Sequence, residues 1–156
     1  METTLTTVCR SIRNYFYQHV NNNAVIFQCG KFKIQDGSIS PSIELIEGQY
    51  YRIVGNIMNN GIYKYGSENF VRDEEFNGYM IPLSIPDDFL DIVADIKAIL
   101  ESKTDNSNVI SESFAGYSYQ LATDDKGTPL SWQDVFAAKL NPYRRHLVEL
   151  VDGRFL

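Results

Sequence analysis

Cysteine is scarce in this chain of 156 residues, which contains two of them, Cys9 and Cys29. Two cysteines are too few for a disulfide framework or a structural zinc site, so we expect neither kind of cross-link. A domain of this length buries about 70% of the surface of its unfolded chain and does not need such cross-links. We interpret Cys29, which lies in a strand-like stretch, as a buried apolar residue.

Basic residues are in the minority, with 14 Lys and Arg against 20 Asp and Glu, a formal net charge of −6. This balance argues against a protein whose main task is to bind nucleic acid phosphates. No apolar run approaches the length of a membrane span, and the first ten residues lack the pattern of a signal peptide. We therefore expect a soluble protein made in a reducing cytoplasm.

Residue patterns typical of an active site are missing. The two histidines, His19 and His146, have no second histidine or cysteine at metal-ligand spacing. Phosphate-binding, dinucleotide-binding and nucleophile-elbow motifs do not occur. The acidic run Asp73–Glu75 lacks calcium-loop spacing and predicts a solvated loop. The sequence therefore predicts no catalytic residue, no metal and no cofactor, and a protein that is not an enzyme.

Aromatic residues are plentiful, with ten Tyr and nine Phe, and many lie in the β-rich stretch 24–84. Asp36–Gly37 separates two strand-like segments and predicts a tight hairpin, because both residues tolerate a positive φ. Asn59–Gly61 predicts a second hairpin for the same reason. A last strand is predicted over Gly78–Ile81, ended by Pro82. Together these signals predict a compact antiparallel sheet or small barrel of about five short strands.

Helices are predicted on both sides of this stretch. Residues 3–18 carry apolar side chains at helical spacing after threonines that can cap a helix. Residues 85–102 have an apolar stripe, with aspartates in the first turn where they complement the helix dipole. A third helix is predicted from Ser131, with Asp134 completing a capping box.

The predicted fold class is α+β: a small helical bundle with three main helices and an inserted antiparallel β-sheet or small barrel. Residues 1–22 and 85–156 would form the helical domain, which ends in a C-terminal arm. Residues 23–84 would form the inserted β domain. Since the β block would be an insertion, we expect the helical part to fold without it.

The most specific pattern lies in the C-terminal third. Ser-Glu-Ser at 111–113 is followed by Ala-Gly-Tyr-Ser-Tyr at 115–119, a Gly/Pro loop, a helix from Trp132, and Leu-Asn-Pro-Tyr-Arg-Arg at 140–145. In order and ending, this pattern resembles the head–tail connector (adaptor) family of long-tailed bacteriophages. The family often has Gly-Asp in place of Ala115-Gly116, and its minimal members connect the helices by a much shorter segment. The block 24–84 is similar to the β domain that some prophage members carry.

The resemblance implies a structural virion protein that assembles into a ring, usually of twelve copies, beneath the portal protein. The ring extends the DNA channel and offers a platform for the stopper or tail-completion protein, and the major capsid protein is a further candidate partner. DNA would pass through without specific binding, and no membrane would be involved. The protein would lie at the head–tail junction of the virion, and in the host cytoplasm during assembly.

The motif residues would then form an interface. Tyr143, Arg144 and Arg145 follow a helix stop and suit an acidic or carbonyl-rich partner surface. In the other interpretation, Tyr143 packs on the last helix and both arginines are solvated or pair with acids between 87 and 95. The candidate interface residues are Ser111, Glu112, Ser113, Gly116, Tyr117, Ser118, Tyr119, Trp132, Tyr143, Arg144 and Arg145.

A second functional hypothesis places the activity in the β block. In this alternative, the chain is a ligand- or glycan-binding β module that its helices merely anchor. The tyrosines of 48–56 and 61–66 favour it, because exposed rows of tyrosine are common in recognition surfaces. The two hypotheses differ in whether the helical end or the β block makes the functional contact.

Overall fold

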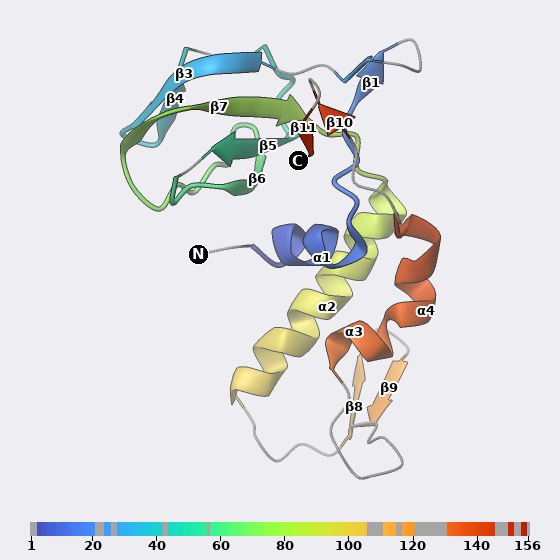
Figure 1. The fold of residues 1–156 in the computed structure, drawn as a ribbon. Coiled ribbons are helices and arrows are strands. Elements are labelled where there is room, and N and C mark those ends of the chain that lie inside the picture. The colour runs from blue at the N-terminus through green and yellow to red at the C-terminus, as the bar shows by residue number, and fades with distance from the viewer. Residues whose placement is uncertain are drawn as a thin grey trace.

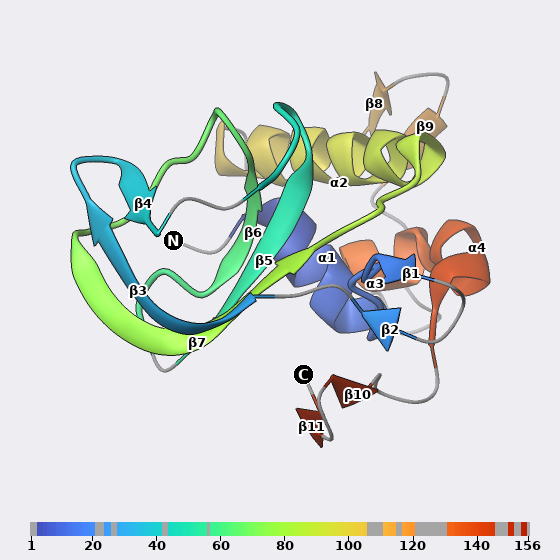
Figure 2. The same cartoon turned by 90° about the horizontal axis from the view of Figure 1, so that it is seen from above.

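The computed structural model describes residues 3–20, 24–25, 28–41, 44–55, 57–105, 111–114, 117–120, 131–145, 150–151 and 154–155. Its main element is a five-stranded antiparallel sheet that curls into a half-barrel, with helices beside it (Figures 1 and 2). The spatial order of the strands is β4-β3-β7-β5-β6. The strands are β3 (Gln28–Gln35), β4 (Ser38–Ser40), β5 (Tyr50–Gly55), β6 (Gly61–Lys64) and β7 (Glu74–Pro82).

Both predicted hairpins of this sheet are confirmed. The β3–β4 hairpin turns at Asp36 and Gly37, whose φ angles are 52° and 74°. Strands β5 and β6 pair antiparallel on either side of the second predicted turn. Strand β7 begins at Glu74, earlier than predicted, and pairs with a strand of each hairpin. The last strand of the sheet in chain order therefore joins the two hairpins.

Three glycines lie side by side across the sheet. Gly78 of β7 pairs with Gly30 of β3 on one side and with Gly55 of β5 on the other. A Cβ atom on Gly78 would lie 2.2 Å from the Val54 carbonyl oxygen, so no larger residue fits there. The ring of Phe76 covers both Gly55 and Gly78. Glycines inside strands mark tight bends, and this row allows the sheet to curl.

One face of the sheet encloses an apolar cluster, called here the inner cluster. Its aromatic contacts include Phe32 with Phe76, at 5.3 Å between ring centroids, and Tyr51 with Tyr63, at 5.9 Å. Side chains from the connecting loops, among them Phe70, pack against it. Its buried members are Phe32, Ile34, Tyr51, Ile53, Phe76 and Met80.

Strand β3 shows why Cys29 does not belong to that cluster. Phe32 and Ile34 point into the inner cluster, and side chains alternate along a strand, so Cys29 lies on the other face. Cys29 is exposed on that face. The interpretation of Cys29 as a buried residue is therefore wrong.

The helices pack against the opposite face of the sheet, and helices and sheet bury their apolar residues together in what we call the shared cluster. The helices are α1 (Thr4–Ile12), α2 (Asp87–Asp105), α3 (Trp132–Val135) and α4 (Ala137–Leu140), followed by the 3-10 turn η1 (Asn141–Tyr143). The buried members of the shared cluster are Val8, Cys9, Ile12, Tyr17, Ile62, Tyr79, Ile81, Leu83, Phe89, Val93, Ile96, Ile99, Phe136 and Leu140.

The predicted fold, a bundle of three main helices with an inserted β domain, is wrong. Of the described helices only α2, with 19 residues, is long, whereas α3 and α4 have four residues each. The reason lies in the shared cluster, where the sheet residues Ile62, Tyr79 and Ile81 complete the apolar core of α1 and α2. A sheet face thus takes the place that a further long helix has in a bundle. The domain boundaries 1–22, 23–84 and 85–156 stay a prediction.

The first helix is shorter than the predicted 3–18 and ends at Ile12. Arg13 adopts a left-handed conformation, with a φ of 57°, and its N–H caps the carbonyls of the last turn. The Asn14 side chain then accepts a hydrogen bond from the Phe16 N–H, which replaces a helical bond. The helical spacing of Tyr15 and Phe16 was misleading, because both pack on the shared cluster from a non-helical segment.

Arg52 of β5 holds this segment against the sheet. Its guanidinium carbon lies 3.6 Å from the centroid of the Tyr15 ring, and its Nη1 donates a hydrogen bond to the Tyr17 hydroxyl. Tyr17 also forms an antiparallel bridge with Leu83, just beyond the end of β7. The chain leaving α1 is therefore fixed to two neighbouring strands.

Three antiparallel pairs of short strands complete the described fold. The pair β8–β9 lies on the side of the helices away from the half-barrel (Figure 1). Among the described residues, no helix combines the length and apolar character needed to cross a membrane. The pairs are β1 (His19–Val20) with β2 (Ala24–Val25), β8 (Ser111–Phe114) with β9 (Tyr117–Gln120), and β10 (Leu150–Val151) with β11 (Arg154–Phe155).

Candidate functional site

The end of the adaptor-like motif is anchored by its backbone at the end of α1. The Asn14 side-chain amide donates a hydrogen bond to the Tyr143 carbonyl at 2.9 Å. The Arg145 N–H donates to the Ile12 carbonyl, also at 2.9 Å. Since Ile12 is the last residue of α1, residues more than 130 positions apart share one helix terminus. The segment 143–145 is thereby held in a defined position.

Tyr143 is half-buried and packs inward. Its ring makes edge contacts with Phe16 and Phe89, at centroid distances of 6.1 and 5.1 Å. Its hydroxyl donates a hydrogen bond to Asp88 at the start of α2, and this bond raises the pKa of Tyr143. This placement agrees with the second interpretation of the motif, in which Tyr143 packs rather than contacting a partner.

That interpretation also allows the two arginines to pair with acids of α2, but two of these acids have other partners. Asp88 accepts from the Tyr143 hydroxyl, and Asp95 lies 3.8 Å from the Lys139 ammonium of α4. In the described part of the chain, Arg144 forms no ion pair with an acid of 87–95. Arg144 instead donates from Nη1 to the Ser11 carbonyl, at 3.2 Å.

Four arginines come together at this junction and form what we call the arginine surface. Arg10 lies in the last turn of α1 and Arg13 caps the helix, where cations complement the negative end of the dipole. Arg144 and Arg145 reach the same helix end through the hydrogen bonds to Ser11 and Ile12. All four arginines are exposed. The sequence prediction included the second pair and missed the first, because only the fold brings α1 to the C-terminal motif.

The remaining motif residues lie elsewhere. Backbone pairing in the β8–β9 hairpin joins Glu112 to Tyr119 and Ser113 to Ser118, with Ser111 and Tyr117 at its two ends. Gly116, and the side chains of the two strands, lie outside the described residues. Trp132 begins α3 and packs, partly buried, on the shared cluster. The predicted capping box of Ser131 and Asp134 is confirmed.

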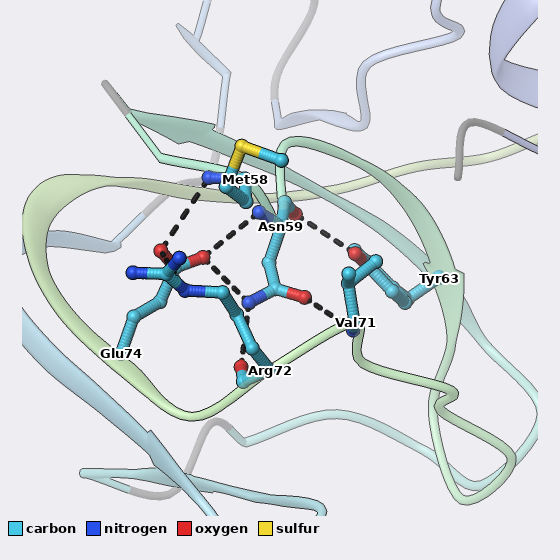
Figure 3. Close-up of polar contacts among 6 residues, drawn as sticks. All are labelled: Met58, Asn59, Tyr63, Val71, Arg72 and Glu74. Carbon is cyan, nitrogen blue, oxygen red and sulfur yellow. Dashed lines mark hydrogen bonds and ion pairs between the residues drawn. The ribbon is translucent and has the colours of Figure 1, made fainter.

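The described part also contains a buried polar network, drawn in Figure 3, around Asn59, which is fully buried. The Asn59 amide nitrogen donates to the Arg72 carbonyl and to the Glu74 carboxylate, and its oxygen accepts from the Val71 N–H. The Tyr63 hydroxyl donates to the Asn59 carbonyl at 2.8 Å. Burial, followed by the charge of Glu74, raises the pKa of Tyr63 to about 12. Since the network satisfies its own polar groups, it holds two loops together rather than a ligand.

The acidic run 73–75 is not a solvated loop throughout, because β7 begins within it. Its three carboxylates have separate partners in the structure. Asp73 accepts from the Asp36 N–H, Glu74 belongs to the Asn59 network, and Glu75 lies 3.7 Å from Lys31. Within the described ranges, no three His, Cys, Asp or Glu side chains are placed to hold a metal ion.

The expected row of exposed tyrosines does not occur in the β block. Tyr51 is fully buried, and Tyr50, Tyr63 and Tyr65 are half-buried. One hollow of about 310 Å³ lies beside Tyr65 and is lined mainly by loop residues such as Glu47. The exposed row of tyrosines that would favour a glycan-binding module is therefore not present in the β block.

Comparisons of this chain with models of protein families, with curated proteins and with solved structures found no match. The functional argument consequently rests on the motif in the sequence and on the place that the fold gives it. That place is the junction of α1, α2 and the segment 141–145, with the arginine surface on its outside.

Proposed function

We propose that this chain is a head–tail adaptor of a long-tailed bacteriophage, a non-enzymatic subunit of a ring beneath the portal protein. One observation carries the proposal. The segment Leu140–Arg145, on which the family resemblance rests, is fixed at the end of α1 with its arginine side chains exposed. An exposed pair of guanidinium groups on an anchored backbone suits a protein contact, because little backbone freedom is lost on binding.

The corrected fold fits this proposal in a modified form. Helices and half-barrel share one cluster of buried residues, so the subunit would enter the ring as one packed unit rather than as a bundle carrying a separate insert. The net charge of −6 suits a ring around DNA, because a channel through which DNA slides must not bind phosphates tightly.

The test is the mass of portal rings, measured by native mass spectrometry before and after adding this protein. We expect one discrete increase that corresponds to a complete ring of 17.8 kDa chains. No increase, with both proteins folded as judged by circular dichroism, would contradict the proposal.

Tyr143→Phe serves as the matched variant for this test. It removes the hydroxyl that binds Asp88 and keeps the ring that packs on Phe16 and Phe89. Since Tyr143 faces inward, we expect the increase in ring mass to be unchanged. A Phe variant that folds normally but no longer binds the portal would show that the hydroxyl itself contacts a partner.

A further inference from the structure

The arginine surface concentrates positive charge in a chain that is otherwise acidic. It is formed by two segments that are far apart in the sequence, the end of α1 and the segment after η1. Taking its four arginines from the 14 basic residues leaves ten, against 20 acids, so the rest of the chain has a formal charge of −10. Such asymmetry is typical of a surface that meets a partner of opposite charge.

Two of these arginines have no carboxylate partner in the described part of the chain. Arg13 uses its backbone N–H to cap α1, and no ion pair of its side chain is found there. The Arg144 guanidinium donates to the Ser11 carbonyl, a neutral acceptor. Both side chains are exposed. Guanidinium groups prefer planar, bidentate acceptors such as carboxylates, which leaves both available for a partner.

The surroundings favour a protein partner over nucleic acid. Asp88 lies next to the arginine surface, because it accepts the hydrogen bond of the Tyr143 hydroxyl, and Asp87 precedes it. A phosphate backbone would be repelled by these carboxylates, whereas a protein surface can place both signs of charge to match.

The same chain also carries exposed acids on α2. Asp87 and Asp91 are one turn apart on α2, both exposed, and neither forms an ion pair or a side-chain hydrogen bond with a described residue. Two other acids of α2, Asp88 and Asp95, are already paired with Tyr143 and Lys139. Unpaired arginines and unpaired aspartates on one molecule are complementary to a second copy of it.

We infer that the arginine surface, through Arg13 and Arg144, binds the exposed aspartates of α2, Asp87 and Asp91, on a neighbouring copy of this chain. This inference rests on the proposed function, since it names the contact between neighbours in the ring. The contact is electrostatic, so it weakens as the salt concentration rises.

The test exchanges the charges. One variant carries Arg13→Glu and Arg144→Glu, a second carries Asp87→Lys and Asp91→Lys, and a third carries all four changes. Each is added to portal rings and weighed by native mass spectrometry, and its fold is checked by circular dichroism. Arg13→Lys with Arg144→Lys is the matched control, because it keeps the charges and the approximate length of the side chains.

We expect the two double-charge variants to lose the ring individually and to recover it when mixed in equal amounts. The fourfold variant restores opposite charges within one chain and is expected to form the ring alone, as is the lysine control. Rings of normal mass from either double variant alone would overturn the inference and leave the adaptor proposal intact. An arginine variant that forms normal rings but loses binding to duplex DNA would overturn it as well.

A failure of the adaptor proposal is recognised separately, because the wild-type chain would then add no mass to the portal. The contact is still tested in that case by sedimentation of the chain alone at low salt. Mixing the two double variants should give association that neither shows by itself. No association in the mixture would overturn the inference.

Discussion

The two faces of the half-barrel are stabilised in different ways. The inner cluster is closed by the strands themselves and by loop residues from the same stretch, such as Phe70. The shared cluster on the other face is completed by α1, α2 and the segment around Leu140, which come from both ends of the chain. The comparison teaches that the β block can bury one of its faces alone, whereas the helices depend on the sheet for their core.

The largest effect is expected from deleting residues 24–84 and joining the flanks. The helices would lose Ile62, Tyr79 and Ile81, and with them one wall of their core. We expect no cooperative thermal unfolding and little helical circular dichroism, because short isolated helices are marginal in water. This reverses the expectation from the sequence that the helical part folds alone. A deletion variant with a cooperative helical transition would show that the helices have a sufficient core without the sheet.

Gly78→Ala affects both clusters, because strand β7 contributes to each. The new Cβ would lie 2.2 Å from the Val54 carbonyl, a backbone atom that moves only if β5 moves. We expect the free energy of unfolding to fall by about 3 kcal/mol, measured by urea denaturation. Gly55→Ala is the milder companion, since its Cβ would meet the Phe76 ring at 3.2 Å. Equal stability of the Gly78 variant and the wild type would contradict the close approach of the strands.

Asn59→Ala tests a part of the β block that does not involve the helices. The largely buried Glu74 carboxylate, whose side chain is 10% exposed, and the backbone groups of residues 71 and 72 would lose hydrogen bonds. Leaving buried polar groups unsatisfied costs about 1–3 kcal/mol, so we expect a loss in this range in urea denaturation. Asn60→Ala is the control, because Asn60 is exposed and its side chain bonds to the backbone of Gly55 alone among the described residues. A loss no greater than that of the control would argue against the network.

The smallest effect concerns pH and the shared cluster. Burial raises the pKa of the Cys9 thiol from 9.0 to about 12, so the folded state prefers the neutral thiol. This stability is complete below pH 9 and is lost as the pH rises towards 12, by about 1.4 kcal/mol per pH unit within that window. We expect Cys9→Ala to flatten the decline in unfolding free energy between pH 9 and 10.5 relative to wild type, by about 1.5 kcal/mol. Parallel curves would indicate an accessible thiol at position 9.

Local features were predictable from the sequence. The Asp36–Gly37 turn and the capping box at Ser131 depend on a few neighbouring residues, and both are confirmed. The first helix was overextended because apolar spacing continues through Tyr15 and Phe16, whereas the αL conformation of Arg13 ends the helix. The spacing of apolar residues predicts which side chains are buried, but it does not show whether they are buried from a helix or from a non-helical segment.

Non-local features were not predictable in this way. That β7 lies between the two hairpins, and that the sheet rather than a further helix covers α1 and α2, depends on pairings between distant segments. The arginine surface was half predicted for the same reason. Arg144 and Arg145 belong to a recognisable motif, while Arg10 and Arg13 join them only through contacts across the fold.

The row formed by Gly30, Gly78 and Gly55 has a consequence for how this protein tolerates change. These three positions are far apart along the chain but adjacent in the sheet. The sheet can curl there because none of the three residues has a side chain. In a library of random substitutions, intolerance would therefore run across the strands as a single column, while neighbouring surface positions on the same strands accept many residues. Exposed positions elsewhere on these strands can therefore be redesigned as long as the three glycines are kept.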